Sequence, residues 1–188
     1  MDLLAHLPVP QGITYAAGVD AVPVGWSDSA FNDDKATGRS TGGCIVGFQG
    51  SGPIIAVSKR LQGVALSSCE AELKMMTETV KKICWLRNIM KEIHLEVKEP
   101  TLIWEDNKGA IDLNRSESMN PRTAHIALRW FFCREKMMDG TARVDYCNTK
   151  RMVADILTKP LPKPAFEFLR KGMLEGKDLS CVQSQERD

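Results

Sequence analysis

The sequence lacks an excess of charge of either sign. Lys and Arg total 25 residues and Asp and Glu total 24 among 188, so the formal net charge is +1. Domains that bind nucleic acid through their overall charge are strongly basic, and this balance excludes that class. Any contact with nucleic acid therefore has to come from local basic patches.

The sequence also lacks the patterns of zinc fingers, secreted disulfide scaffolds and membrane proteins. Its six cysteines form no Cys-x-x-Cys pair, and no histidine stands at zinc-finger spacing from them. The N-terminus has no basic segment ahead of a long apolar run, and no stretch approaches the roughly 20 apolar residues of a membrane span. We expect an intracellular protein with reduced cysteines and no membrane contact.

What is present is apolar sequence for one substantial core, because 43% of the residues are hydrophobic. Residues 1–19 are interrupted by Pro and Gly and predict a leader. Residues 20–174 contain the periodic patterns of a domain, and residues 175–188 predict a flexible polar tail.

The first periodic segment predicts a strand that ends in a carboxylate. Val22, Val24, Trp26 and Asp28 share one face of an extended chain, since strand side chains alternate with period two. Residues 42–48 and 53–57 predict two further strands around a Gly-Ser-Gly turn. The three strands are expected to form an antiparallel meander.

A long helix follows, with Ser67 and Ser68 as candidate N-caps and an end near residue 94. At about 100° per residue, Glu72 lies on the same face as the apolar stripe that includes Met76 and Val80. Glu70 points about 200° away from Glu72 and is expected to face solvent or to cap the helix.

The second half of the chain predicts alternating strands and helices. A buried strand at residues 101–105 leads into Asp106 and a helix at 107–114, and a further helix runs from about residue 120 to 138. A strand at 141–146 precedes a last helix, capped by Asn148 or Thr149, that carries Asp155 and ends at Pro160. The order β-β-β-α-β-α-α-β-α predicts a three-layer α/β sandwich with a five-stranded mixed sheet.

Four carboxylates on four different elements are expected to converge in this fold: Asp28, Glu72, Asp106 and Asp155. The first and fourth strands would be parallel neighbours, and such strands present their ligands at their carboxyl ends. Carboxylates brought together repel one another unless cations lie between them, and oxygen ligands suit Mg²⁺ or Mn²⁺.

Several motifs in this order resemble the ribonuclease H domain of copia-type retrotransposon polyproteins, over about residues 12–172. The segments that carry the resemblance are Gly25-Trp26-Ser27-Asp28, Arg39-Ser40-Thr41-Gly42-Gly43, Ala65-Leu66-Ser67-Ser68-Cys69-Glu70-Ala71-Glu72, Glu105-Asp106-Asn107, Arg122-Thr123-Ala124-His125-Ile126, Arg134-Glu135-Lys136 and Val153-Ala154-Asp155-Ile156-Leu157-Thr158-Lys159-Pro160-Leu161. The leader then resembles the end of the segment that connects reverse transcriptase to ribonuclease H.

The resemblance implies that Asp28, Glu72, Asp106 and Asp155 are metal ligands and catalytic residues that hold two Mg²⁺ or Mn²⁺ ions. It implies hydrolysis of the RNA strand of RNA:DNA hybrids to 5′-phosphate and 3′-hydroxyl ends. The partners would be the hybrid and the reverse transcriptase portion of a polyprotein, in the cytoplasm, a virus-like particle or the nucleus. Candidate nucleic-acid contacts are Ser67, Ser68, Asn107, Arg122 and His125, although helix capping explains Ser67, Ser68 and Asn107 equally well.

Two other functions remain open. A transposase or integrase core would use the same acidic chemistry on DNA, but the fourth acid, Asp155, and the order of the elements favour ribonuclease H. A domesticated, non-catalytic binding module of the same fold is the second alternative. The segment around His125 favours it, because Ala124 and Ala127 stand where the family has Lys and Asp.

Overall fold

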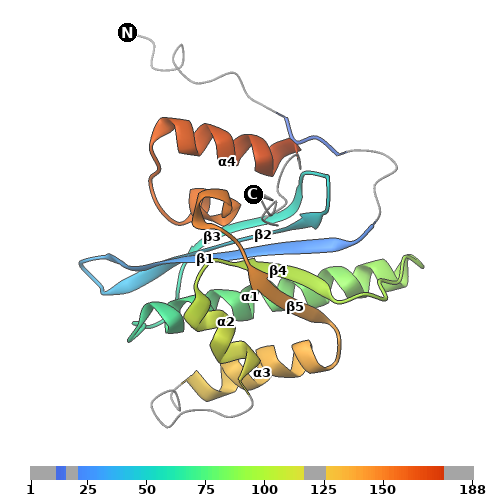
Figure 1. The fold of residues 1–188 in the computed structure, drawn as a ribbon, viewed down its shortest axis with the longest axis horizontal. Helices are drawn as coiled ribbons and strands as arrows, with labels where there is room; N and C mark the ends of the chain where they lie inside the picture. Colours follow the sequence, from blue (N-terminus) through green and yellow to red (C-terminus); the bar gives the residue numbers. More distant parts are fainter. Residues whose placement is uncertain (1–11, 16–20, 117–125, 176–188) are drawn as a thin grey trace, which may run out of the picture.

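The centre of the molecule is a five-stranded sheet in the order β3-β2-β1-β4-β5 (Figure 1). The structure is a computed structural model and describes residues 12–15, 21–116 and 126–175. Neighbouring strands are antiparallel from β3 to β1 and parallel from β1 to β5. The expected mixed sheet is thus confirmed, with strands β1 (Pro23–Asp34), β2 (Arg39–Phe48), β3 (Pro53–Arg60), β4 (Thr101–Glu105) and β5 (Ala142–Tyr146).

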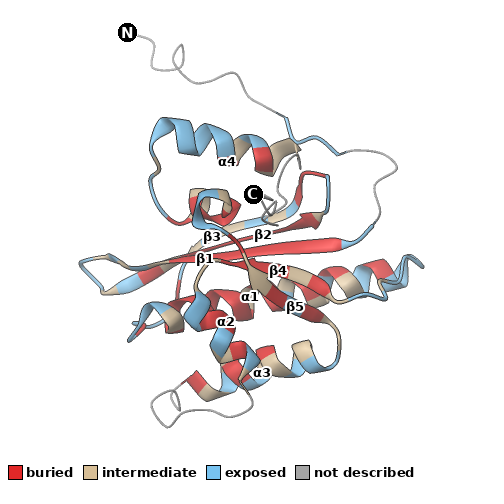
Figure 2. Cartoon of the chain, in the orientation of Figure 1, coloured by how far each residue is buried: buried red, intermediate tan, exposed pale blue. Residues whose placement is uncertain are grey.

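Helices cover both faces of the sheet and make the expected three layers (Figure 1). One face carries α1 (Ser68–Glu92), α2 (Lys108–Arg115) and α3 (Ala127–Met138), and the other carries η4 (Val153–Leu157) and α4 (Lys163–Glu175). Because strand side chains alternate, Ile103 of β4 packs into the α1 layer while Trp104 packs into the η4 layer. Figure 2 shows buried residues along the strands and in parts of the helices that flank the sheet.

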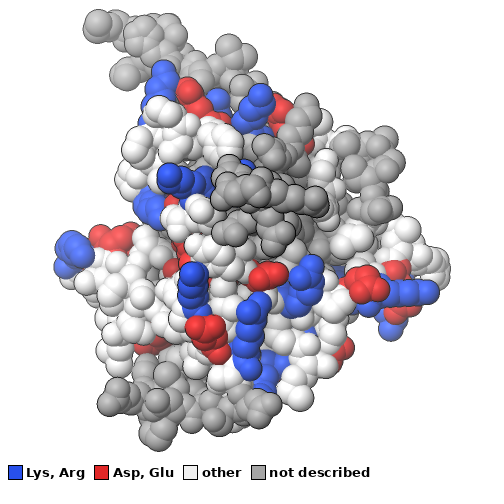
Figure 3. Space-filling view, viewed as in Figure 1, with Lys and Arg blue, Asp and Glu red and all other residues white. Residues whose placement is uncertain are grey.

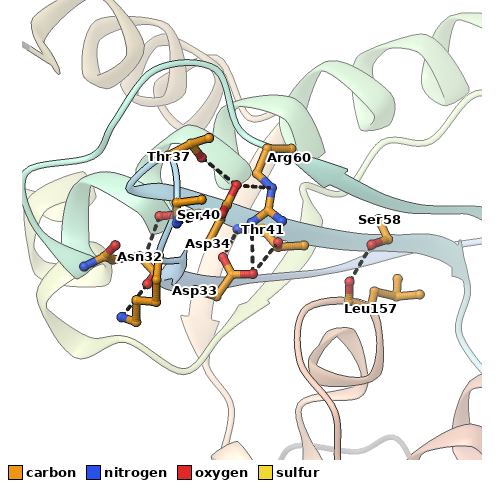
Figure 4. A network of polar contacts seen from close by, with 11 residues as sticks. Asn32, Asp33, Asp34, Thr37, Ser40, Thr41, Ser58, Arg60 and Leu157 are labelled. Atoms are coloured by element: carbon orange, nitrogen blue, oxygen red, sulfur yellow. Dashed lines mark hydrogen bonds and ion pairs between the residues drawn. The ribbon is translucent and has the colours of Figure 1, made fainter.

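The first strand is longer than expected, since β1 continues beyond Asp28 to Asp34 and forms a hairpin with β2. Polar contacts stabilise this extension (Figure 4). The backbone N–H and the hydroxyl of Thr41 each donate to Asp33 at 2.7 Å, and Arg60 of β3 donates to the same carboxylate at 3.0 Å. Side chains from three strands therefore hold the exposed end of the hairpin together.

The prediction of one final helix carrying Asp155 was wrong. Asn148 caps a turn as expected, but that turn is the short 3₁₀ helix η3 (Thr149–Arg151), and Asp155 lies on a second one, η4. Extended backbone at Met152 separates the two turns. The α-helix of this region, α4, was not predicted and starts after Pro160 and Pro162, which cannot donate the backbone hydrogen bonds of a helix interior.

Parts of the remaining expectations fall outside the described residues. These parts are residues 1–11 and 16–19 of the leader, residues 176–188 of the tail and the start of the helix expected from residue 120. Thr14 and Tyr15 of the leader contact the domain: the Thr14 N–H donates to the Leu174 carbonyl at 2.9 Å, and the Tyr15 hydroxyl donates to the Pro53 carbonyl at 2.9 Å.

The cysteines depart from expectation at one position. Cys44, Cys69, Cys84 and Cys133 are free, as expected, but Cys147 is disulfide-bonded. Among the described residues, no helix is both long enough and apolar enough to span a membrane.

Candidate active site

The site begins just beyond the last paired residues of the parallel strands β1 and β4. Their pairing ends at Trp26 and Trp104, and Asp28 and Asp106 each lie two residues beyond the last pair. Asp28 and Asp106 therefore lie near each other beyond the end of the β1–β4 pairing, at the carboxyl end of β4.

Glu72 of α1 completes a cluster with these two aspartates. Carboxylate oxygens of Asp28, Glu72 and Asp106 all lie within 4.8 Å of one another. Asp28 and Glu72 are buried, at 3% and 4% exposure, and Asp106 is partly exposed. Three of the four residues expected to converge are thus brought together, and the glutamate of α1 that lies in this cluster is Glu72.

The fourth expected residue, Asp155, lies beside Asp28. The Thr158 hydroxyl, one turn beyond Asp155, donates to Asp28 Oδ2 at 2.5 Å, and the Lys159 ammonium lies 2.8 Å from Asp155 Oδ1. Asp155 is 4% exposed, and its charge contributes to raising the pKa of Asp28. The segment from Asp155 in η4 to Lys159 just beyond it therefore places a carboxylate, a hydroxyl and an ammonium group on one side of the cluster.

Contacts with two strands hold η4 against the sheet. Ser58 of β3 donates to the Leu157 carbonyl at 2.6 Å (Figure 4). Gly43 of β2, which pairs with Asp28, allows the close approach: a Cβ at this position would lie 2.9 Å from the Ala154 carbonyl oxygen. A side chain there would push η4, and Asp155 with it, away from Asp28.

The acidic cluster is electrostatically unfavourable in the protein alone. Burial raises the pKa of Asp28 to about 6, and the neighbouring charge of Asp155 adds to the rise. Burial also raises the pKa of Glu72 well above its usual range, with further contributions from Glu105 and Asp28, and it raises the pKa of Asp106. A bound cation would relieve this repulsion, because it favours the ionised form of each carboxylate.

Glu105 is a buried carboxylate that the sequence analysis did not single out. It is the last residue of β4 and is fully buried, and its Oε1 accepts the Asn107 N–H at 3.1 Å. Its Oε2 accepts no hydrogen bond from the residues described, and burial raises its pKa. The available sequence signal was a charged residue closing an otherwise apolar strand.

Glu70 has a different role from the one expected of a solvent-facing residue. It is 5% exposed and accepts the Leu66 N–H at 2.7 Å, as a capping residue does. It also forms an ion pair with Lys74 at 2.9 Å, and both side chains are buried. The expectation that Glu70 would face solvent or cap the helix is met by capping, and Lys74, one turn later, compensates the charge of the buried carboxylate.

The candidate nucleic-acid contacts are only partly described. Ser67 caps α1 by accepting the Glu70 N–H at 3.1 Å, and Asn107 caps α2 by accepting the Ala110 N–H at 3.1 Å. Ser68 is exposed on the first turn of α1. Arg122 and His125 lie outside the described residues. The face seen in Figure 3 shows basic and acidic side chains interspersed, as the near-neutral net charge suggests.

Comparison with known proteins yields relatives along most of the chain, although no family model matches it. The retrovirus-related Pol polyprotein from transposon RE2 of Arabidopsis thaliana is 36% identical over 147 residues, 78% of this chain. That from transposon TNT 1-94 of Nicotiana tabacum is 34% identical over 154 residues, 82% of this chain. The chain belongs to the copia-type transposon Pol proteins. It spans about a tenth of the length of these relatives, 10% and 11% respectively.

Solved structures place this copia-type Pol segment in the ribonuclease H fold. LC11-RNase H1, isolated from compost, superposes with a TM-score of 0.58 at 8% identity and covers 73% of this chain and 93% of its own. The N-terminal RNase H domain of Rv2228c from Mycobacterium tuberculosis has a TM-score of 0.55 at 11% identity, covering 81% of this chain and 98% of its own. At these identities the likeness shows the fold alone.

Proposed function

We propose that this chain is a ribonuclease H that hydrolyses the RNA strand of RNA:DNA hybrids. The observation that carries the proposal is the convergence of Asp28, Glu72 and Asp106 within 4.8 Å, just beyond the last paired residues of β1 and β4. Homology to transposon Pol proteins and a ribonuclease H fold support it. So does LC11-RNase H1, whose structure is also known in complex with an RNA/DNA hybrid and superposes with a TM-score of 0.54.

The donor set fits two Mg²⁺ or Mn²⁺ ions, since all four residues offer carboxylate oxygens and Glu72 Oε2 is buried without a hydrogen-bond partner among the described residues. Asp28, Glu72, Asp106 and Asp155 would hold these ions, since Asp28 clusters with Glu72 and Asp106 and also neighbours Asp155. When bound, two such ions supply activation of a water molecule and stabilisation of the departing 3′ oxygen. The products would carry 5′-phosphate and 3′-hydroxyl ends.

The residues of the chain orient this chemistry. The Thr158 hydroxyl holds Asp28 Oδ2, and the Asn107 N–H holds Glu105 beneath the cluster. Ser67, Ser68 and Asn107 lie at the starts of the helices next to the ligands, where they could contact the hybrid backbone and its 2′-hydroxyls. We assign Arg122 and His125 to hybrid binding on the resemblance alone.

The biological setting follows from the relatives. Their names describe Pol polyproteins, so we propose that this domain acts next to a reverse transcriptase inside the cell and removes the RNA template during reverse transcription.

The test compares substrates under one set of conditions. The purified chain is incubated with a labelled RNA:DNA hybrid, duplex DNA and duplex RNA, in Mg²⁺ or Mn²⁺ and in EDTA. We expect metal-dependent cutting of the RNA strand within the hybrid and little cutting of either duplex, because only the hybrid combines 2′-hydroxyls with a mixed groove shape. Equal cutting of duplex DNA would favour a transposase-like enzyme, and binding of the hybrid without cutting would favour a non-catalytic module.

A further inference from the structure

Lys159 brings a positive charge into the acidic cluster. Its ammonium lies 2.8 Å from Asp155 Oδ1, and its side chain is 41% exposed while that of Asp155 is 5% exposed. Burial alone would lower the pKa of Lys159, but the bond to Asp155 and the charges of Asp28, Asp155 and Asp106 raise it. The ammonium therefore interacts with carboxylates from β1, from the end of β4 and from η4.

The four carboxylates are not equivalent in this arrangement. Oxygens of Asp28, Glu72 and Asp106 lie within 4.8 Å of one another, whereas Asp155 forms an ion pair with the ammonium of Lys159. The Lys159 backbone N–H also donates to the Asp155 carbonyl at 3.2 Å, so the turn that carries Asp155 fixes the lysine beside it. One group of ligands is open to a cation, and the fourth ligand is already paired with one.

The net charge of the four carboxylates depends on how many cations lie among them. One divalent ion and the ammonium together bring three positive charges to four carboxylates, which leaves one negative charge. A second divalent ion beside an unmoved ammonium would reverse the sign and place like charges against each other at Asp155. Asp155 can therefore pair with the second ion or with the Lys159 ammonium, but not with both.

We propose that Lys159 is a positioning residue that competes with the second metal ion for Asp155 and so makes the two ion sites unequal. This inference rests on the proposed function. The first ion binds to Asp28, Glu72 and Asp106 while Lys159 stays on Asp155. The second ion binds only when the ammonium moves away, and the exposed part of the side chain gives it room to do so.

The test measures Mn²⁺ binding by calorimetry in the absence of nucleic acid. In the unaltered chain we expect two binding steps, the second at least tenfold weaker than the first. Lys159→Met removes the charge and keeps most of the side-chain length. It should strengthen the second step about tenfold, the equivalent of one charge-assisted hydrogen bond, and strengthen the first step by less, because the ammonium is paired with Asp155 and interacts with Asp28 and Asp106 only through their charges. Lys159→Arg should retain the wild-type difference, which a purely structural role would not predict.

A matched control and a second variant keep the result interpretable. Lys163→Met removes an ammonium that is 85% exposed and 4.0 Å from Glu167, and it should bind Mn²⁺ as the unaltered chain does. Lys159→Gln replaces Lys159→Met if the latter does not fold. An unchanged or weaker second step in the charge-free variant overturns the Lys159 inference, even if the hybrid is cut. The absence of any Mn²⁺ binding in the unaltered chain overturns this inference together with the metal centre of the proposed function.

Discussion

Asp28→Asn should make the metal-free protein more stable at neutral pH, although it removes a proposed ligand. Asp28 is 3% exposed, and burial together with Asp155 raises its pKa from 3.8 to about 6. Each pKa unit corresponds to about 1.4 kcal/mol, so holding Asp28 ionised in the folded state costs about 3 kcal/mol at most. Asparagine has nearly the same shape and can still accept the Thr158 hydrogen bond without carrying the charge.

The sign of the pH dependence follows from the raised pKa. Between about pH 4 and pH 6 the folded protein retains a proton on Asp28 that the unfolded chain has lost, so unfolding free energy falls as pH rises through this window. Above about pH 6 the full penalty is present. The advantage of Asp28→Asn should therefore be close to zero at pH 4 and approach its maximum at pH 7.5.

Urea denaturation in EDTA at pH 4, 6 and 7.5 measures this difference. The exposed Asp112→Asn serves as control and should change the unfolding free energy by less than about 0.5 kcal/mol. Millimolar Mg²⁺ should reverse the order at pH 7.5, because it stabilises the intact cluster and not the variant. An Asp28→Asn protein that is no more stable than the unaltered chain in EDTA at pH 7.5, or whose advantage does not grow with pH, would refute the reasoning.

Three further predictions address other parts of the site. After EDTA treatment, millimolar Mg²⁺ or Mn²⁺ should raise the melting temperature, because an ion that binds only the folded protein stabilises it. Asp106→Asn should reduce this rise. Identical melting of the unaltered chain with and without metal would count against a metal site at the cluster. Glu70→Gln should keep hybrid cleavage in a gel assay. It should lose about 1–3 kcal/mol of stability in urea denaturation, because it breaks the buried ion pair with Lys74. A loss of cleavage in the folded variant would move the site to Glu70. Gly43→Ala should lower the free energy of unfolding by about 1–3 kcal/mol and weaken cleavage, because the added Cβ displaces η4. Wild-type stability in urea denaturation would contradict this, since it would show that η4 can shift without loss of stability.

Patterns along the chain were sufficient to predict the sheet and the main cluster. Alternation along β1 placed Asp28 at the end of an apolar row, and the phase of α1 selected Glu72 over Glu70. Both patterns depend on local geometry, the period of two in strands and about 3.6 in helices, and burial of the apolar face fixes that geometry in the fold. Asp106 followed because it comes directly after a buried strand.

Features that depend on partners distant in the sequence could not be predicted in the same way. The ammonium of Lys159 approaches Asp28 only because Gly43 of β2 lets η4 approach the sheet. Full burial of Glu105 depends on the helices packed on that face of the sheet, α1 over β1 and α2 beside β4, which no local pattern encodes. The missed helix α4 has a local cause instead: Pro164 reads as a helix breaker but stands in the first turn, where no N–H is required.

The central claim, that the carboxylate cluster cuts RNA in hybrids, is tested most directly by comparing Glu72→Gln with the unaltered chain. Both are incubated with a 5′-labelled RNA paired to DNA in Mg²⁺, and the new ends are analysed on a sequencing gel. The account predicts internal cuts with 5′-phosphate and 3′-hydroxyl ends for the unaltered chain, and a loss of about 10²-fold or more for a folded Glu72→Gln protein, as expected when a charge-stabilising group is removed. Wild-type cleavage by Glu72→Gln, or no cleavage by the unaltered chain at any Mg²⁺ or Mn²⁺ concentration, would contradict it.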